Sequence, residues 1–111
     1  MAYGSPSSPE DIRPYLEDIR EGRPVSDAAV DELTERYRRI GGRSPLTDLT
    51  LAQADALRSR LGPDVPVAVG MRNWHPFIRN ALAELAAAGV QRVVGIPLAP
   101  QFSTLSVDKY F

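Results

Sequence analysis

The stretch Val65-Pro66-Val67-Ala68-Val69-Gly70-Met71 decides the fold that we expect for this chain. It is a short and nearly continuous apolar run, which is typical of a strand buried on both faces in a parallel sheet. The apolar spacing over residues 76–88 predicts a helix, and residues 92–98 form a second apolar run of strand length. A strand, a helix and a strand of these lengths predict a right-handed βαβ unit. We therefore expect an α/β fold with a parallel sheet flanked by helices.

Helix-capping signals place further helices along the chain. A serine at the start, proline or acidic residues in the first turn and a glycine after the last turn are the usual signals. These signals predict helices that follow Ser8-Pro9, Ser26, Thr50 and Ser106 and that cover residues 9–21, 27–40, 51–61 and the end of the chain.

The composition fits a globular chain and excludes several classes of protein. The 111 residues suit one small domain or part of a larger one, and 43% of them are hydrophobic. A net charge of −1 predicts no nucleic-acid partner, and without cysteine there is neither a disulfide nor a thiolate metal site. No apolar run is long enough to cross a bilayer and no signal peptide is visible, so we expect a cytoplasmic protein. Nucleotide-binding glycine loops, zinc-binding spacings and hydrolase nucleophile motifs are absent from the sequence.

Polar turns follow three apolar segments, at residues 3–5, 72–75 and 100–104. If these segments are parallel strands, the turns meet at one edge of the sheet and form a binding site there. Polar loops are also common at strand ends without any function, and the residues alone leave both interpretations open. The first segment, Met1-Ala2-Tyr3, is too short to be a strand by itself, so we expect apolar residues before it in a complete protein.

Four residues are candidates for binding a ligand. Tyr3 comes first, because a phenol at a strand end can ligate iron or donate a hydrogen bond. Arg20 and Arg36 could bind a carboxylate through their planar guanidinium groups. Ser44 follows two glycines in a tight loop that could grip an anion. A packed aromatic ring, a solvated arginine and a plain loop are the commoner roles of such residues. His75 lacks an obvious partner in the sequence, and we assign it no catalytic role.

Five motifs, taken in order, resemble the ferrochelatases, the enzymes that insert iron into a porphyrin. The resemblance covers essentially the whole chain, and the Ser/Pro/acid-rich segment after Gly4 is most similar to the bacterial coproporphyrin branch. Each motif alone is weakly specific, whereas five in order are quite specific. The motifs are Met1-Ala2-Tyr3-Gly4-Ser5-Pro6, Ile19-Arg20-Glu21-Gly22-Arg23, Arg36-Tyr37-Arg38-Arg39-Ile40-Gly41-Gly42-Arg43-Ser44-Pro45-Leu46, Pro76-Phe77-Ile78 and Leu98-Ala99-Pro100-Gln101-Phe102-Ser103-Thr104-Leu105-Ser106.

The resemblance implies a two-lobed, Rossmann-like (chelatase-like) α/β enzyme that binds the porphyrin in a cleft between its lobes. Residues 1–111 are then the N-terminal part of the first lobe, an incomplete single lobe, and the second lobe is absent. The implied activity is the insertion of ferrous iron into coproporphyrin III, or into protoporphyrin IX, in heme biosynthesis. Fe2+ is a substrate, no tightly bound cofactor is expected, and the complete enzyme is expected to be monomeric.

The resemblance also implies roles for individual residues. Tyr3 matches the tyrosine that lies at one face of the porphyrin and can approach the metal. Arg20, Arg36, Tyr37 and Ser44 match positions that contact the propionates or line the cleft. The guanidinium fork is chemically suited to those carboxylates.

The sequence departs from the family pattern in ways that limit these expectations. The family's catalytic histidine and its acidic partner lie beyond Phe111, so we expect no catalytic residue in this chain and no activity of the chain alone. His75 does not match that histidine, and Gln101 stands where relatives often carry histidine. Two other interpretations stay open: a non-catalytic tetrapyrrole-binding or interaction module, and a truncated product without independent function.

Overall fold

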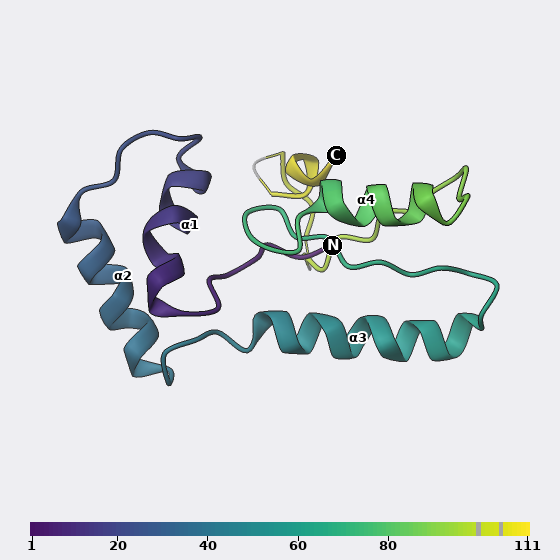
Figure 1. Cartoon of the computed structure of the whole chain (residues 1–111), viewed down its shortest axis with the longest axis horizontal. Coiled ribbons are helices and arrows are strands. Elements are labelled where there is room, and N and C mark those ends of the chain that lie inside the picture. The colour runs from purple at the N-terminus through teal and green to yellow at the C-terminus, as the bar shows by residue number, and fades with distance from the viewer. Residues whose placement is uncertain (100, 105) are drawn as a thin grey trace.

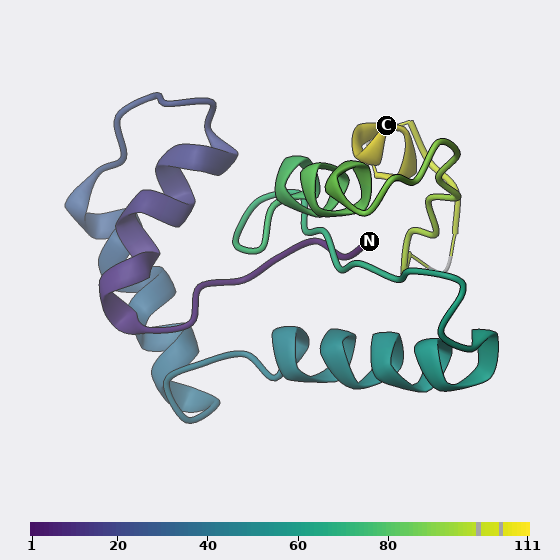
Figure 2. The same cartoon turned by 45° about the vertical axis from the view of Figure 1, so that its right-hand side comes forward.

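Four α-helices and two short 3-10 helices make up the regular structure of the described residues, which are 1–99, 101–104 and 106–111 of this computed structural model. Helices α1 and α2 pack together at one end of the molecule, whereas α3 and α4 lie apart on either side of the N-terminal segment (Figure 1, Figure 2). In chain order the elements are η1 (Pro9–Asp11), α1 (Ile12–Ile19), α2 (Asp27–Arg39), α3 (Leu46–Leu61), α4 (Ile78–Ala87) and η2 (Val107–Tyr110).

Local capping explains where the helices begin. The Ser26 side chain accepts a hydrogen bond from the backbone N–H of Ala29 at 3.3 Å, so α2 starts directly after Ser26, as the sequence predicts. Helix α3 begins at Leu46, directly after Pro45 and earlier than the predicted start at residue 51, and the Ser44 hydroxyl accepts a hydrogen bond from the N–H of Leu46 at 3.2 Å. In the part of the chain that the structure describes, no helix has the length and apolar character needed to cross a membrane.

The predicted parallel sheet is wrong, because no β-strand forms within the described residues. Two isolated parallel bridges, Ala2 with Met71 and Met71 with Phe77, are the strand-like pairs found there. The expected α/β, Rossmann-like single lobe is therefore corrected to a helical structure with irregular segments at residues 65–70 and 90–98. These segments have the apolar composition of buried strands but not their continuous pairing.

The sheet does not form because of what lies between the two apolar segments, residues 65–70 and 90–98. Among the described residues, Met1 and Ala2 are the ones that form backbone hydrogen bonds to both segments. The Ala2 N–H donates to Gly70 O at 3.1 Å and the Arg72 N–H donates to Ala2 O at 3.0 Å. On the other side, the Met1 ammonium donates to Ile96 O and the Leu98 N–H donates to Met1 O, both at 2.7 Å. A ladder needs a partner along its whole length, and two residues do not supply one.

The buried core is small and lies near the N-terminal segment. Ile12, Met71 and Pro6 are the largest side chains that are fully buried. Large aliphatic residues on α3 and α4, including Leu57 and Leu82, are exposed. The radius of gyration is 15.5 Å, compared with about 13 Å for a compact domain of this length. The molecule is therefore open between α3 and α4.

Candidate functional site

The N-terminal turn lies at the centre of the candidate site. Gly4, Ser5 and Pro6 are buried, whereas Tyr3 is 46% exposed. Gly4 has a φ of +91°, and a Cβ there would lie 2.7 Å from the backbone nitrogen of Trp74. Only glycine satisfies both conditions, since other residues rarely adopt this φ and none fits the space. The turn is therefore pressed against the segment that carries Trp74.

Asn73 fixes the backbone of Tyr3. Its N–H donates to the Tyr3 carbonyl oxygen at 2.9 Å, and its side-chain Nδ2 donates to the same oxygen at 3.3 Å. Asn73 is buried, whereas the Tyr3 ring lies 6.0 Å from the guanidinium carbon of Arg72. The phenol of Tyr3 is thus presented to solvent from a fixed backbone, beside a cation.

The phenols of the four tyrosines of the chain, Tyr3, Tyr15, Tyr37 and Tyr110, lie near enough to influence one another electrostatically, and we call these four residues the tyrosine cluster. Burial raises the pKa of the Tyr15 phenol, and repulsion from the Tyr37 and Tyr3 phenolates raises that pKa further. Burial also raises the pKa of Tyr110, while the Arg72 guanidinium opposes this change. Tyr15 therefore stays protonated and neutral at neutral pH.

Tyr15 connects α1 to the turn. Its ring and the Trp74 ring make a T-shaped contact with their centroids 5.9 Å apart. Its hydroxyl donates a long hydrogen bond of 3.4 Å to Gly4 O. Trp74 in turn contacts the His75 ring at 5.3 Å. These aromatic contacts join α1, the N-terminal turn and residues 74–75 into one surface.

Tyr37 brings helix α2 to the same surface. It is half-buried, and burial raises the pKa of its phenol, whereas the nearby Ser5 hydroxyl lowers that pKa. Ser5 Oγ is itself buried and makes no hydrogen bond of ordinary geometry among the described residues. The two hydroxyls therefore lie close together without forming a well-directed bond. Tyr3 and Tyr37 are the two predicted site residues that the structure brings to one cluster.

The other predicted site residues are engaged locally. Arg20 Nη1 donates to Pro24 O at 3.2 Å. Arg36 forms an exposed ion pair with Glu32, one helical turn before it. The Ser44 hydroxyl accepts from the Leu46 N–H at the start of α3, as described above. Within the described residues, no hydrogen bond or ion pair joins Arg20, Arg36 or Ser44 to the tyrosine cluster.

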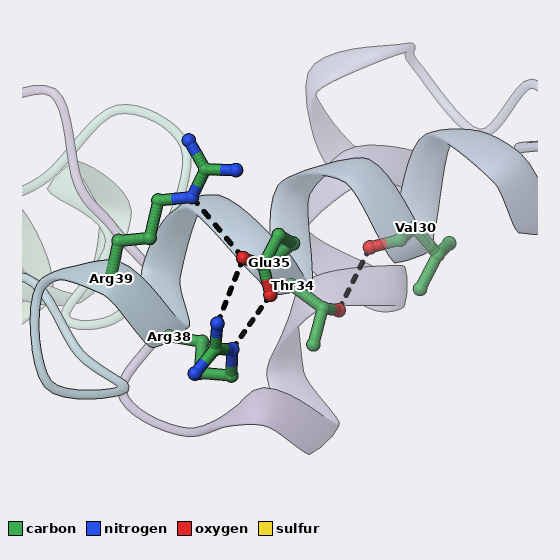
Figure 3. A network of polar contacts seen from close by, with 5 residues as sticks. All are labelled: Val30, Thr34, Glu35, Arg38 and Arg39. Atoms are coloured by element: carbon green, nitrogen blue, oxygen red, sulfur yellow. Dashed lines mark hydrogen bonds and ion pairs between the residues drawn. The ribbon is translucent and has the colours of Figure 1, made fainter.

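The C-terminal end of α2 carries a charged network (Figure 3). Glu35 accepts hydrogen bonds from Arg38 at 2.7 and 3.0 Å and from Arg39 at 3.2 Å. Arg38 and then Arg39 hold the pKa of the Glu35 carboxyl below its usual range. In the same view, Thr34 donates to the Val30 carbonyl at 2.8 Å. Arginines at a helix C-terminus also complement the helix dipole. The charges of Glu35, Arg38 and Arg39 are therefore balanced by one another and by the helix, and they require no ligand.

His75 makes aromatic contacts. Its ring lies 4.5 Å from that of Phe77 and packs against Trp74. No group of three metal-binding side chains is present among residues 1–99, 101–104 and 106–111. Pro100 and Leu105, which belong to the third polar turn and to the last motif, lie outside the described residues. The remaining residues of that turn, 101–104, make no hydrogen bond to the other two turns within the described chain.

Three residues of this site were missed by the sequence analysis. Asn73 and Arg72 belong to the polar turn at residues 72–75, which the sequence placed at the site without giving either residue a role. Tyr15 lies in the first predicted helix, and nothing in its spacing distinguishes it from a core aromatic residue. The signal in the sequence was an asparagine directly after a predicted strand, because an amide that becomes buried there has to bond to a partner such as a backbone group.

Comparisons with known proteins agree with this arrangement of motifs. The ferrochelatase family model matches residues 1–111. The chain is 45% identical over 113 residues to a ferrochelatase of Deinococcus radiodurans, covering 99% of this chain and 36% of that protein. It is 44% identical over 115 residues to a coproporphyrin III ferrochelatase of Halalkalibacterium halodurans, covering 99% and 37%, respectively. A ferrochelatase of Thermus thermophilus is 41% identical over 130 residues, covering 99% and 41%.

The chain therefore spans about 36 to 41% of the length of these relatives. The resemblance to the ferrochelatases is confirmed over residues 1–111. This chain belongs to the ferrochelatase family.

Proposed function

We propose that residues 1–111 form one wall of a porphyrin site in an enzyme that inserts Fe2+ into coproporphyrin III. The observation that carries this proposal is the position of Tyr3, whose carbonyl is held by Asn73 while its ring is exposed beside Arg72. An exposed phenol on a fixed backbone can face a flat macrocycle and its metal. The name of the Halalkalibacterium halodurans relative supports coproporphyrin III as the porphyrin, with protoporphyrin IX as the alternative.

The arginines are proposed to bind the propionates of the porphyrin. Arg36 and Glu32 are both well exposed, and an exposed ion pair of this kind contributes little to stability. Arg36 can therefore exchange Glu32 for a ligand carboxylate at small cost. Arg20 uses one guanidinium nitrogen for Pro24 O, which leaves further N–H groups for a second carboxylate.

Tyr37 and Ser44 complete the proposed wall. Tyr37 lies next to the N-terminal turn, as its effect on Tyr15 and its response to Ser5 indicate. Ser44 accepts a bond from Leu46 through its oxygen, so its O–H proton is available to a ligand. Both roles follow from the match to the family motifs.

Metal insertion requires that two pyrrole protons leave the macrocycle as Fe2+ enters. Tyr3 is the proposed oxygen-bearing residue on the metal side, and Fe2+ is a substrate rather than a resident cofactor. His75 packs against the rings of Trp74 and Phe77, and these contacts give it no carboxylate partner. We therefore infer that this chain binds the porphyrin and that the base which accepts the pyrrole protons is supplied elsewhere in the complete enzyme.

The test is a titration of the purified chain with metal-free coproporphyrin III, followed by absorbance, with Fe2+ then added anaerobically. We expect saturable binding that Arg36→Ala weakens and that Arg23→Ala, a matched exposed arginine, leaves unchanged. We expect no iron insertion above the uncatalysed rate. A lack of saturable binding, or equal loss in both variants, would overturn the proposed wall.

A non-catalytic tetrapyrrole carrier is the second candidate function. It is favoured by the contacts of His75, which packs against the rings of Trp74 and Phe77 and has no carboxylate partner among the described residues. The two functions differ in ligand preference, because a carrier of the product binds the iron-containing porphyrin more tightly than the metal-free one. A catalytic wall has no reason to hold its product tightly. Parallel titrations with metal-free and iron-containing coproporphyrin III therefore separate them.

A further inference from the structure

Arg72 is a half-buried arginine whose guanidinium has no acceptor among the described residues. It forms no ion pair there, and its side chain donates no hydrogen bond. Arg13 is the other half-buried arginine of the described chain, and it donates to Val25 O at 3.2 Å and pairs with Asp27. A guanidinium that leaves water without an acceptor loses solvation energy, so the position of Arg72 favours an anionic ligand.

The backbone at Arg72 is fixed by hydrogen bonds at the residue itself and on both sides of it. The Arg72 N–H donates to Ala2 O at 3.0 Å, and the Met71 N–H donates to Pro76 O at 2.7 Å. Asn73 donates to the Tyr3 carbonyl from its N–H and from its side chain. A side chain on a fixed backbone loses less freedom when it binds a ligand, so the base of Arg72 is preorganised.

Two tyrosines flank the Arg72 guanidinium. Its carbon lies 6.0 Å from the centre of the Tyr3 ring, which is at the outer limit of about 6 Å for a cation–π contact. It is also close enough to Tyr110 to oppose the rise in the pKa of that phenol. These contacts place Arg72 beside Tyr3 but leave its N–H groups without an acceptor, because an aromatic face satisfies none of them in a directed bond.

Arg72 adds a third guanidinium to the proposed porphyrin wall. Arg20 follows the last residue of α1 and Arg36 lies on α2, whereas Arg72 lies in residues 70–77, which lead into α4. Each guanidinium can bind one carboxylate through two parallel hydrogen bonds. Protoporphyrin IX carries two propionates, which the first two arginines suffice to bind. Coproporphyrin III carries four, so it has a carboxylate for a third arginine.

We propose that Arg72 is a specificity-determining residue, which binds a propionate that coproporphyrin III carries and that protoporphyrin IX replaces with a vinyl group. This inference rests on the proposed function, in which Tyr3 faces the macrocycle. Because Arg72 stands beside the Tyr3 ring, a macrocycle on that ring brings substituents of its edge to the guanidinium. A vinyl group there leaves the half-buried charge without an acceptor, and a site built for a polar group rejects the analogue that lacks it.

The test compares metal-free coproporphyrin III with metal-free mesoporphyrin IX, which carries two ethyl groups in place of two of the propionates and is otherwise the same. Each porphyrin is titrated with the purified chain and followed by fluorescence. We expect the chain to bind coproporphyrin III at least about tenfold more tightly, because charge-assisted hydrogen bonds are worth about that factor or more.

Variants of Arg72 assign this preference to one side chain. Arg72→Gln removes the charge and should weaken coproporphyrin III binding at least about tenfold, while mesoporphyrin IX binding stays within about threefold. Arg72→Lys keeps the charge but not the planar fork, and should keep at least about a threefold preference. Arg60→Gln is the matched control, because Arg60 is exposed on α3 and forms no ion pair among the described residues. It should leave both affinities unchanged.

The outcomes separate this inference from the proposed function. Saturable binding of both porphyrins with equal affinity, or a preference that Arg72→Gln leaves intact, would overturn the role of Arg72 and keep the porphyrin wall. Equal loss of both porphyrins in Arg72→Gln would give Arg72 a structural role instead. No saturable binding of either porphyrin would overturn the wall and this inference together. Circular dichroism checks the fold of each variant, and Arg72→Met, which keeps the apolar stem, replaces Arg72→Gln if that variant is unfolded.

Discussion

Asn73 holds Tyr3 through two hydrogen bonds to one carbonyl oxygen, from its own N–H at 2.9 Å and from its side-chain Nδ2 at 3.3 Å. A carbonyl with both lone pairs bonded resists rotation of its peptide plane. The direction in which the Tyr3 ring leaves the backbone is therefore set by a buried amide. This relationship makes Asn73 a positioning residue for the proposed porphyrin wall.

Asn73→Ala removes the side-chain bond and retains the backbone bond. We expect a loss of about 1 kcal/mol in the free energy of unfolding, which is the usual net value of one such bond. Urea unfolding followed by circular dichroism measures this loss. Asn80→Ala, an exposed asparagine on α4, is the control and should cost nothing. Equal stability of the Asn73→Ala chain and the unsubstituted chain would contradict the role of the amide.

Replacing Gly4 or Gly41 with alanine separates two causes of lost stability, which are backbone strain and steric overlap. Both have a φ near +90°, but a Cβ at Gly4 meets Trp74 N at 2.7 Å, whereas a Cβ at Gly41 meets nothing within 4 Å. Gly41→Ala should therefore cost about 1–2 kcal/mol from backbone strain alone. Gly4→Ala should cost about 1–3 kcal/mol more, because Trp74 has to move. Equal losses of unfolding free energy in the two variants would show that the turn is not tightly packed.

The helices could be predicted because their signals are local. Ser26 and the residues that follow it fix the start of α2 by a hydrogen bond within one turn. The start of α3 was placed too late because Thr50 looked like a capping residue. Thr50 instead donates its hydroxyl proton to Leu46 O inside the helix, and the helix starts after Pro45, where the Ser44 hydroxyl accepts from the Leu46 N–H.

The sheet could not be predicted by the same reasoning, because strand pairing is not local. Residues 65–70 read as a buried strand, yet their pairing depends on which chain lies beside them. Within the described residues, the backbone that pairs with this stretch is that of Ala2, which forms a single bridge to Met71. For the site, the turn at residues 3–5 and the turn at residues 72–75 do meet, as Asn73 and Gly4 demonstrate. That contact comes from backbone hydrogen bonds beside the single bridge between Ala2 and Met71, and from the Asn73 side chain, rather than from the edge of a continuous sheet.

The tyrosine cluster should make the fold sensitive to alkaline pH. Burial raises the pKa of Tyr15 above its ordinary value of 10, so the unfolded chain loses this proton at lower pH than the folded chain. The contribution to stability is complete below pH 10 and falls as the pH rises above that value.

Tyr15→Phe removes this titration. The variant should lose less unfolding free energy than the unsubstituted chain when urea titrations are compared at pH 8 and above pH 10. Some loss should persist, because the pKa values of Tyr37 and Tyr110 are also raised. An identical dependence on pH in the two chains would contradict a buried Tyr15 phenol.

If their proposed roles are right, substitutions of Tyr3 and of Arg36 should affect different properties of the protein. Tyr3→Phe removes one hydroxyl from an exposed ring and keeps the ring itself, so coproporphyrin III should bind within about threefold of its original affinity. Arg36→Ala removes a charge-assisted contact to a propionate, which is worth about 1.5–3 kcal/mol, so the dissociation constant should rise at least about tenfold. Absorbance titration of both variants measures the two effects. In the complete enzyme, Tyr3→Phe should instead change the rate of metal insertion. Equal losses of porphyrin affinity in the two variants would remove the distinction between a metal-side phenol and a propionate-binding arginine.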